Sequence, residues 1–278
     1  MSDLAGRTFL VTGANTGIGK ETVRALAGRG ARVVLAGRSE DKTKAAIDEI
    51  AGETGNTDLD FLALDLGDLS SVRKAATTFL ESGEPLHVLI NNAGLAGAKG
   101  LTASGFELAF GTNHVGPFLF TELLREHLIE SGPGRIVNVA STGHYRAKGI
   151  DWDAVRQPAV SRTAFDEYCV SKLANVLHAQ ELARRLQGTG VATYSLHPGA
   201  IASDVWREVP FGLRHVLKLF MKSTADGAKT SLYCATSPDV AGDSGLYYDN
   251  SREKTPSKYA TDELADELWR RSEAWVMG

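Results

Sequence analysis

The sequence predicts an α/β fold: a single doubly wound, mainly parallel seven-stranded sheet with helices on both faces. Short runs rich in apolar and β-branched residues alternate with helical patterns from one end of the chain to the other. These runs are almost continuously apolar rather than alternating, which is typical of strands buried on both faces of a parallel sheet. Because a parallel strand needs a crossover, each run followed by a helix indicates right-handed βαβ units.

The elements follow in order along the chain. The predicted strands are Thr8–Gly13, Ala31–Ala36, Asp60–Leu64, His87–Asn91, Arg135–Ala140, Ala192–His197 and Gly245–Tyr248. The predicted helices are Lys20–Ala27, Lys42–Ala51, Ser70–Glu81, Ser104–Glu130, Asp166–Leu186, Ala225–Thr236 and Asp262–Val276. We expect Pro117 to kink or interrupt the fourth helix, because proline lacks the N–H that continues a helix.

Composition and charge place the chain among ordinary globular proteins. Its 278 residues are 43% hydrophobic and 23% charged, and no linker or repeat divides them, so we expect one domain over residues 1–278. A net charge of −4 without a basic stretch argues against a nucleic-acid partner. Two cysteines are too few for a disulfide framework and fit a reducing compartment. With no signal peptide or transmembrane span in the pattern, we expect a cytoplasmic protein.

A glycine-rich segment between the first strand and the first helix predicts a nucleotide site. Its members are Gly13, Asn15, Thr16, Gly17, Ile18 and Gly19. Glycines allow a tight turn there, and backbone N–H groups can approach a pyrophosphate at the positive end of the helix. A phosphate-binding Walker loop would require glycine at position 14 and Ser or Thr at position 21, where Ala14 and Glu21 stand. A simple turn is the remaining alternative.

The end of the second strand indicates which nucleotide binds. An NAD-binding protein places an acidic residue there for the ribose hydroxyls, but no acid occurs in this segment before Glu40. Arg38 can instead form a charge-assisted pair with a 2′-phosphate, and Lys42 is a weaker candidate. The alternative is that Arg38 is a solvated surface residue. We predict NADP(H) as the cofactor, in preference to NAD(H).

Two further strand ends fit the same ligand. Asp65 and Leu66 follow the third strand, where the carboxylate can accept from an adenine amino group. Asn92, Ala93 and Gly94 follow the fourth strand, at the edge where open α/β sheets bind ligands. Both segments can also be explained as turns.

A tyrosine and a lysine four positions apart predict the catalytic centre. Tyr168 and Lys172 lie on one face of a predicted helix. A phenol ionises near pH 10, and a neighbouring ammonium together with an oxidised nicotinamide should lower the pKa of Tyr168. Ser141 follows the fifth strand at the ligand edge, where its hydroxyl can hold a substrate oxygen against Tyr168. Asn113 lies in the long helical pattern and can disrupt it locally to hold a water molecule.

These motifs, in this order, resemble the short-chain dehydrogenase/reductase family over essentially the whole chain. The resemblance implies a Rossmann fold and makes Tyr168 the general acid in reduction and general base in oxidation. It also implies that Ser141 polarises the carbonyl, Asn113 supports a water relay, and Lys172 binds the nicotinamide ribose and lowers the pKa of Tyr168. The loop at the end of the sixth strand resembles the family's nicotinamide-binding loop, which adds Pro198, Gly199, Ile201 and Ser203 to the expected cofactor site.

Within the family, the retinol-dehydrogenase-like subgroup looks most similar. Thr112–Phe118, Tyr168–Ala174, Gln180–Arg185 and Leu268–Glu273 carry that similarity, and so does an insertion over Gly143–Glu167. Animal members commonly carry an N-terminal membrane anchor, whereas the first strand here begins almost at once, so retinoid itself is not assigned as substrate.

A strongly apolar segment near 203–224, centred on Trp206–Lys222, is the expected substrate lid. It predicts a lipophilic aldehyde, ketone or alcohol, which can be a retinal- or retinol-like, steroid or long-chain compound, or contact with a membrane surface; a helix packing on the core is the alternative. We expect no metal, since His114, His144 and His197 lack ligand spacing with the cysteines. Homo-oligomerisation through the long helices is a family habit that the sequence leaves open.

The predicted activity is therefore NADP(H)-dependent interconversion of a carbonyl and an alcohol by hydride transfer. One alternative is a non-catalytic NADP-binding regulator on the same fold, although such proteins typically lose the tyrosine or the lysine. A second alternative is reduction of a carbon–carbon double bond, as in protochlorophyllide-reductase-like relatives.

Overall fold

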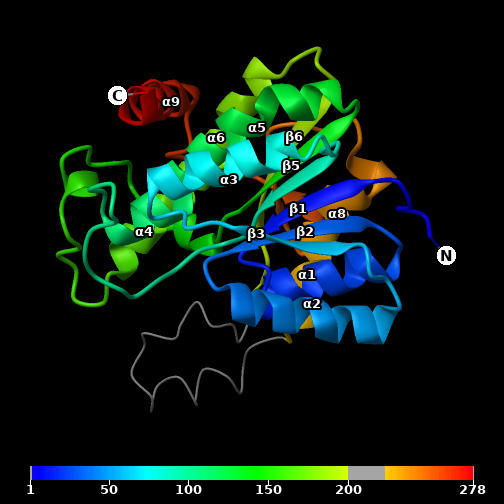
Figure 1. Cartoon of the computed structure of the whole chain (residues 1–278). Helices are drawn as coiled ribbons and strands as arrows, with labels where there is room; N and C mark the ends of the chain where they lie inside the picture. The colour runs from blue at the N-terminus through cyan, green and yellow to red at the C-terminus, as the bar shows by residue number, and fades with distance from the viewer. Residues whose placement is uncertain (1, 200–222, 278) are drawn as a thin grey trace.

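The computed structural model describes residues 2–199 and 223–277 and contains one eight-stranded sheet in the order β3-β2-β1-β4-β5-β6-β7-β8 (Figure 1). Neighbouring strands are parallel except for the antiparallel pair β7–β8. The strands are β1 (Thr8–Thr12), β2 (Arg32–Gly37), β3 (Leu59–Ala63), β4 (Val88–Asn91), β5 (Gly134–Val139), β6 (Val191–His197), β7 (Leu246–Asp249) and β8 (Arg252–Lys254). The predicted doubly wound fold class is confirmed.

The count of seven strands omitted β8. All three residues of this strand are exposed, so it has no apolar run by which the sequence could reveal it. Asn250 and Ser251 both adopt positive φ angles, 50° and 55°, and reverse the chain between β7 and β8. The strand therefore exists because a tight turn brings it back against β7, and its own composition contributes little.

Helices cover both faces of the sheet, as Figure 1 shows. Helices α1 (Gly17–Gly28), α2 (Glu40–Thr54) and α8 (Thr224–Thr236) lie together on one face, with α1 packed against α2 and α8. On the other face lie α3 (Leu69–Glu81), α5 (Gly116–Glu130) and α6 (Phe165–Arg185), with α9 (Asp262–Met277) packed on α6. The short helices are α4 (Leu108–Phe110), η1 (Gly111–Val115), η2 (Thr142–Tyr145), η3 (Ala154–Arg156) and η5 (Pro238–Val240).

The apolar core forms because the strand side chains are buried on both sides. All residues of β1 and β4 are buried, and each face of the sheet has its own apolar cluster. Local signals set the helix ends: the side chains of Ser39 and Asp68 accept backbone N–H groups at the starts of α2 and α3. Gly55, at φ 71°, ends α2.

The predicted long helix Ser104–Glu130 is divided. Gly105 adopts a φ of 76°, and regular helix starts only at Leu108. Residues Gly111–Val115 form a π-helical turn before α5, and Pro117 lies in the first turn of α5. Because Pro117 has no N–H, it cannot donate the α-helical bond to the carbonyl of Asn113, which is compatible with the wider turn.

The C-terminal helix α9 covers part of the surface of α6. Trp269, 1% exposed, packs edge-on against Phe118 of α5 at 4.9 Å between ring centroids. Arg185 of α6 lies 4.3 Å above the Trp269 ring. Trp152 of the predicted insertion contacts α9 through Trp275 at 6.2 Å. Homo-oligomerisation through the long helices stays a prediction, and this part of their surface is occupied by the chain's own helix.

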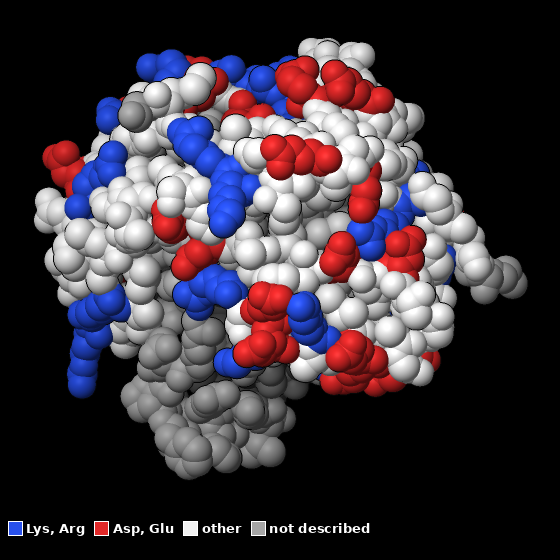
Figure 2. Space-filling view, viewed as in Figure 1, with Lys and Arg blue, Asp and Glu red and all other residues white. Residues whose placement is uncertain are grey.

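Charges of both signs lie side by side on the face of the molecule shown in Figure 2. Several form ion pairs between neighbouring helices: Arg24 of α1 contacts Glu49 of α2 at 2.7 Å. Such exposed pairs contribute little to stability individually. In the part of the chain that the structure describes, no helix combines the length and apolar composition that crossing a membrane requires.

Candidate active site

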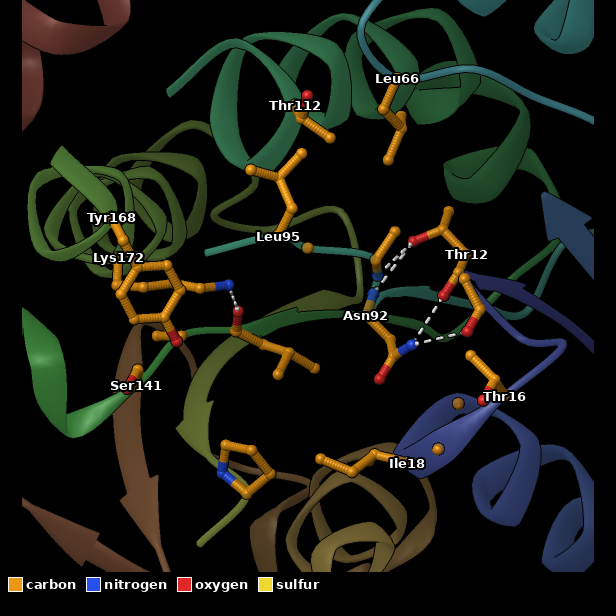
Figure 3. Close-up of a pocket in the computed structure, with 18 of the residues that line it drawn as sticks. Thr12, Thr16, Ile18, Leu66, Asn92, Leu95, Thr112, Ser141, Tyr168 and Lys172 are labelled. Atoms are coloured by element: carbon orange, nitrogen blue, oxygen red, sulfur yellow. Dashed lines mark hydrogen bonds between the residues drawn. The ribbon is translucent and has the colours of Figure 1, made fainter. Parts of the chain in front are cut away.

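One pocket at the carboxyl ends of the parallel strands brings most of the predicted site residues together (Figure 3). Asn113 lies behind its wall, and Ile201 and Ser203 fall outside the described residues, as does nearly all of the predicted lid. The predicted residues that line the pocket are Gly13, Asn15, Thr16, Gly17, Ile18, Gly19, Arg38, Asp65, Leu66, Asn92, Ala93, Gly94, Ser141, Tyr168, Lys172, Pro198 and Gly199.

The glycine-rich loop is built for close backbone approach. Gly13 adopts a φ of 64°, and a Cβ there would lie 2.9 Å from the Cα of Ala93. A Cβ on Gly19 would collide with the carbonyl oxygen of Gly13 and lie 2.5 Å from Nδ2 of Asn92. These two glycines therefore leave room only for backbone, which lets helix α1 begin directly at the pocket.

A side-chain and backbone network joins the glycine loop to the end of β4. The Thr12 hydroxyl accepts the N–H groups of Asn92 and Ala93, each at 3.0 Å. The Asn92 amide donates back to the carbonyl of Thr12 at 2.8 Å. This reciprocal bonding, drawn in Figure 3, holds the glycine-rich loop against the loop after β4. The sequence alone predicted that each of these loops binds the nucleotide, but not that they bond to one another.

The residues at the ends of β2 and β3 fit a phosphorylated nucleotide. Arg38 lines the pocket, and within residues 2–199 and 223–277 it has no carboxylate partner. The first turn of α1 contains no acidic residue that would repel an anion at its positive end. Asp65 holds its own turn by accepting the N–H of Gly67 at 2.9 Å, and the residue also lines the pocket. The residues present therefore fit NAD(P)(H).

Tyr168 and Lys172 lie on one face of α6, as their spacing predicts. Lys172 Nζ lies 5.7 Å from the centroid of the Tyr168 ring and donates a 2.8 Å hydrogen bond to the carbonyl of Val139. Both side chains are buried, at 5% and 3% exposure. Figure 3 shows them beside Ser141 on one side of the pocket, with Thr16 and Ile18 on the other.

The pKa of Tyr168 differs from the sequence-based expectation. Burial raises the pKa of Tyr168 to about 12, and a hydrogen bond with Ser141 opposes that rise. Burial also lowers the pKa of Lys172 to about 7. Among the protein's own groups, desolvation therefore outweighs the attraction between phenolate and ammonium. The predicted lowering of the Tyr168 pKa requires the positive charge of an oxidised nicotinamide beside Lys172, so it stays a prediction for the nucleotide-bound protein, and the polypeptide's own groups shift this pKa upward.

Ser141 is held at the start of the η2 turn. Its Oγ accepts the N–H of Gly143 at 3.1 Å, which leaves the hydroxyl proton available for another acceptor. The neighbouring Thr142 N–H donates to Nδ1 of His197 at 3.3 Å. These contacts fix the loop after β5 on the side of the pocket that contains Tyr168.

The side chain of Asn113 is fully engaged with protein groups. Its Oδ1 accepts the Leu95 N–H at 2.9 Å, and its Nδ2 donates to the Leu95 carbonyl at 3.0 Å and to Ser171 Oγ at 2.9 Å. The amide thereby ties the loop after β4 to α6. A water relay through this residue stays a prediction.

Sequence reasoning missed several residues that shape the pocket. Thr12, Leu95, Val139, Phe165 and His197 were not among the predicted site residues, although all of them line it. Thr12 and Val139 belong to buried strands, so their patterns indicate only core. Phe165 gave a usable signal, because it stands three positions before Tyr168 on the same helix, and the two rings stack at 5.8 Å.

A nucleotide loop at the ligand edge of a doubly wound sheet, sharing one pocket with a buried tyrosine–lysine pair, defines a dinucleotide-dependent oxidoreductase. The chain belongs to the short-chain dehydrogenase family: the family model described as "short chain dehydrogenase" matches residues 7–152. The resemblance predicted from the sequence is confirmed.

Relatives narrow the position within the family. Human dehydrogenase/reductase SDR family member 13 is 44% identical over 279 residues, covering 98% of this chain and 74% of the relative. Human retinol dehydrogenase 12 is 44% identical over 273 residues, covering 97% and 86%. These similarities confirm the retinol-dehydrogenase-like subgroup.

Solved structures share the fold. An uncharacterized protein from Mycobacterium paratuberculosis superposes with a TM-score of 0.78 at 30% identity, covering 99% of this chain and 94% of the other. A dehydrogenase structure from Beutenbergia cavernae, with NADP bound at low occupancy, has a TM-score of 0.71 at 26% identity, covering 89% and 96%.

Proposed function

We propose that this protein is an NADP(H)-dependent oxidoreductase that interconverts a carbonyl group and an alcohol on a lipophilic substrate. The observation that carries the proposal is the shared pocket. It joins Ser141, Tyr168 and Lys172 to a glycine-rich loop and to Arg38. When bound, the nicotinamide supplies the hydride in reduction and accepts it in oxidation.

The hydroxyl groups of Ser141 and Tyr168 have different roles at the substrate oxygen. While its Oγ accepts the Gly143 N–H, Ser141 donates its hydroxyl proton to the substrate oxygen and polarises the carbonyl. Tyr168 transfers its own proton to the oxygen during reduction and takes it back during oxidation. Lys172, whose Nζ is fixed by the Val139 carbonyl, stabilises the phenolate that remains. Asn113 supports this centre through the loop at Leu95 and through α6.

NADP(H) is preferred because of the end of β2. Arg38 offers a guanidinium to a 2′-phosphate, and an acidic side chain that would bind the ribose hydroxyls of NAD(H) is missing from that position. The NADP found in the Beutenbergia cavernae structure supports this choice.

A lipophilic substrate fits the wall beside Tyr168. Leu95, Phe165 and Pro198 line the pocket, and the Phe165 ring stacks on Tyr168 at 5.8 Å, so these side chains offer apolar surface to a carbon skeleton. The names of the retinol dehydrogenases to which the chain is similar point in the same direction. A cytoplasmic location and contact with a membrane surface stay predictions.

The test compares the wild-type protein with Tyr168→Phe, using Tyr233→Phe as a control because Tyr233 lies on α8 away from the pocket. Each protein is titrated with NADPH and NADH and assayed against small polar, long-chain and polycyclic carbonyls. We expect tighter NADPH binding, faster turnover of the apolar compounds, and a loss of about 10²–10⁴-fold in kcat only for Tyr168→Phe.

Other results point to the alternatives. NADPH binding with no tyrosine-dependent turnover would favour a regulator, and turnover confined to conjugated double bonds would favour a double-bond reductase. Faster turnover of small polar carbonyls would contradict the lipophilic substrate.

A further inference from the structure

A buried histidine lies directly beside the serine of the site. His144 is the third residue of the η2 turn, which starts immediately after Ser141, and its side chain is 0% exposed. It does not line the pocket, so it cannot contact a substrate or a nucleotide there. Its contacts are with the protein alone.

Both imidazole nitrogens of His144 have partners, and the partners fix its tautomer. Nδ1 lies 2.6 Å from the carbonyl oxygen of Ser141, which can only accept a hydrogen bond. Nε2 lies 3.1 Å from the backbone nitrogen of Ser257, which can only donate. The ring is therefore neutral, with its proton on Nδ1.

The Nδ1 contact acts on the backbone of Ser141. The Ser141 carbonyl accepts two hydrogen bonds, from the His144 backbone N–H at 3.1 Å and from Nδ1. These bonds close the turn that presents the Gly143 N–H to Ser141 Oγ. The direction of the Ser141 hydroxyl thus depends on a turn that His144 stabilises from behind.

The Nε2 contact reaches a distant part of the chain. Ser257 follows β8 and precedes α9, 113 positions after His144. The adjacent Tyr145 hydroxyl donates to the carbonyl of Thr255 at 2.7 Å, so two neighbouring side chains hold the same segment. Tyr247 of β7 packs edge-on against the His144 ring at 4.6 Å.

We propose that His144 is a positioning residue for the proposed reaction: it connects the carbonyl of Ser141 to the backbone at Ser257 and so sets the orientation of the serine hydroxyl. This inference rests on the proposed function for its catalytic consequence. The connection itself is a property of the folded chain and can be tested without substrate.

Two conservative substitutions separate the two contacts. His144→Asn keeps a donor near the position of Nδ1 and loses the contact with Ser257. His144→Gln keeps an acceptor near the position of Nε2 and loses the donor to Ser141. His144→Phe loses both and keeps a ring between Tyr145 and Tyr247. His127→Asn is the control, because His127 also bonds a backbone carbonyl, that of Glu84 at 2.7 Å, but lies away from the pocket.

Amide hydrogen exchange of the full-length protein, followed by NMR, reads the two contacts independently. The Gly143 N–H is protected only while Ser141 Oγ is held in place, and the Ser257 N–H only while Nε2 accepts it. We expect Gly143 to exchange at least about 10-fold faster in His144→Gln and His144→Phe, with little change in His144→Asn. The Ser257 N–H should exchange faster in His144→Asn, which loses the acceptor, and change little in His144→Gln.

Kinetics then test the catalytic consequence. We expect kcat to fall about 10-fold or more in the Gln and Phe variants, to be largely retained in the Asn variant, and KM and the Kd for NADPH to stay near the wild-type values. A kcat that follows the melting temperature of the variants, or that is unchanged in all three, would overturn the proposal. So would equal exchange of Gly143 in the Asn and Gln variants.

A wild-type protein that reduces no carbonyl would contradict the proposed function alone. The exchange pattern would still decide whether His144 holds the turn at Ser141.

Discussion

The Nζ of Lys172 donates a 2.8 Å hydrogen bond to the carbonyl of Val139, two residues before Ser141. Asn175, one turn further along α6, donates to the same carbonyl at 3.2 Å. The helix that carries Tyr168 is therefore tied to the end of the strand that leads to Ser141. This relationship holds the two predicted catalytic hydroxyls at a fixed distance, although 27 positions separate them in the chain.

Lys172→Met should make the protein more stable and less active. The pKa of Lys172 is lowered from 10.5 to about 7 by burial, so the unfolded chain binds the proton more tightly and stability falls as the pH drops through this interval. Each pH unit there corresponds to about 1.4 kcal/mol, so replacing the lysine should raise the free energy of unfolding at pH 7 by at most about 5 kcal/mol.

In Lys172→Met the Val139 carbonyl still accepts the hydrogen bond from Asn175, so the substitution does not leave this buried carbonyl without a donor. Denaturant unfolding at pH 7 and pH 10, with kcat measured in parallel, checks the prediction. We expect a gain in stability at pH 7 that shrinks toward pH 10, and a kcat reduced by about 10² or more. A variant less stable than wild type at pH 7 would contradict the conclusion that burying the Lys172 ammonium lowers the free energy of unfolding.

Gly19→Ala should abolish nucleotide binding. The added Cβ would collide with the carbonyl oxygen of Gly13 and lie 2.5 Å from Asn92 Nδ2, so the loop must open. Gly28→Ala, at the other end of α1, is the matched control, because its Cβ would meet nothing closer than 3.9 Å. We expect the control to bind NADPH normally and to gain about 0.4–1 kcal/mol of stability. Isothermal titration and thermal unfolding measure both effects; normal binding by Gly19→Ala would show that the loop tolerates the opening.

Arg38→Ala should weaken NADPH binding without weakening NADH binding. Loss of a charge-assisted pair costs about 1.5–3 kcal/mol, which corresponds to about 10–100-fold in Kd. Fluorescence titration with both nucleotides measures the ratio of the two Kd values. Lys20→Ala is the control, since Lys20 is already paired with Glu49 at 2.6 Å. An equal loss for both nucleotides would mean that Arg38 contacts a group that they share.

His178 should make the protein sensitive to acid. Burial lowers the pKa of His178 from 6.5 to about 4, and its Nε2 has no partner among the described residues. His178 binds a proton less readily in the folded protein than in the unfolded chain. The free energy of unfolding is therefore highest, with respect to this group, above pH 6.5, and it falls by about 3 kcal/mol in total as the pH drops toward 4. Replacement by phenylalanine keeps the ring contact with Phe118 and removes the titration.

The measurement is the difference in unfolding free energy between wild type and His178→Phe from pH 7.5 to pH 4. Glu122, whose pKa burial raises to about 7, affects stability with the opposite sign, so only this difference isolates the histidine. We expect the variant to gain relative to wild type as the pH falls. A constant difference would show that His178 is not buried as a neutral ring.

Much of the fold was readable from the sequence because buried parallel strands require long apolar runs. The seven predicted strands all occur, with ends displaced by one residue or so. β8 was missed because its three residues are exposed and depend on the turn at Asn250 and Ser251. Gly13, Gly17, Gly19, Ser141, Tyr168 and Lys172 could be predicted because each stands at a strand end or at helical spacing, and the structure brings them to one pocket.

The sequence by itself therefore determined the doubly wound fold, the pocket at its ligand edge and the residue types that line it. Tertiary structure decided the pKa values of the side chains in that pocket and the long-range contacts that hold its loops in place. Whether Tyr168 and Lys172 have raised or lowered pKa values depends on how completely other elements remove them from water. Likewise, the contact between His144 and Ser257 joins residues 113 positions apart, and no local pattern encodes a hydrogen bond that forms only when β8 has returned against β7.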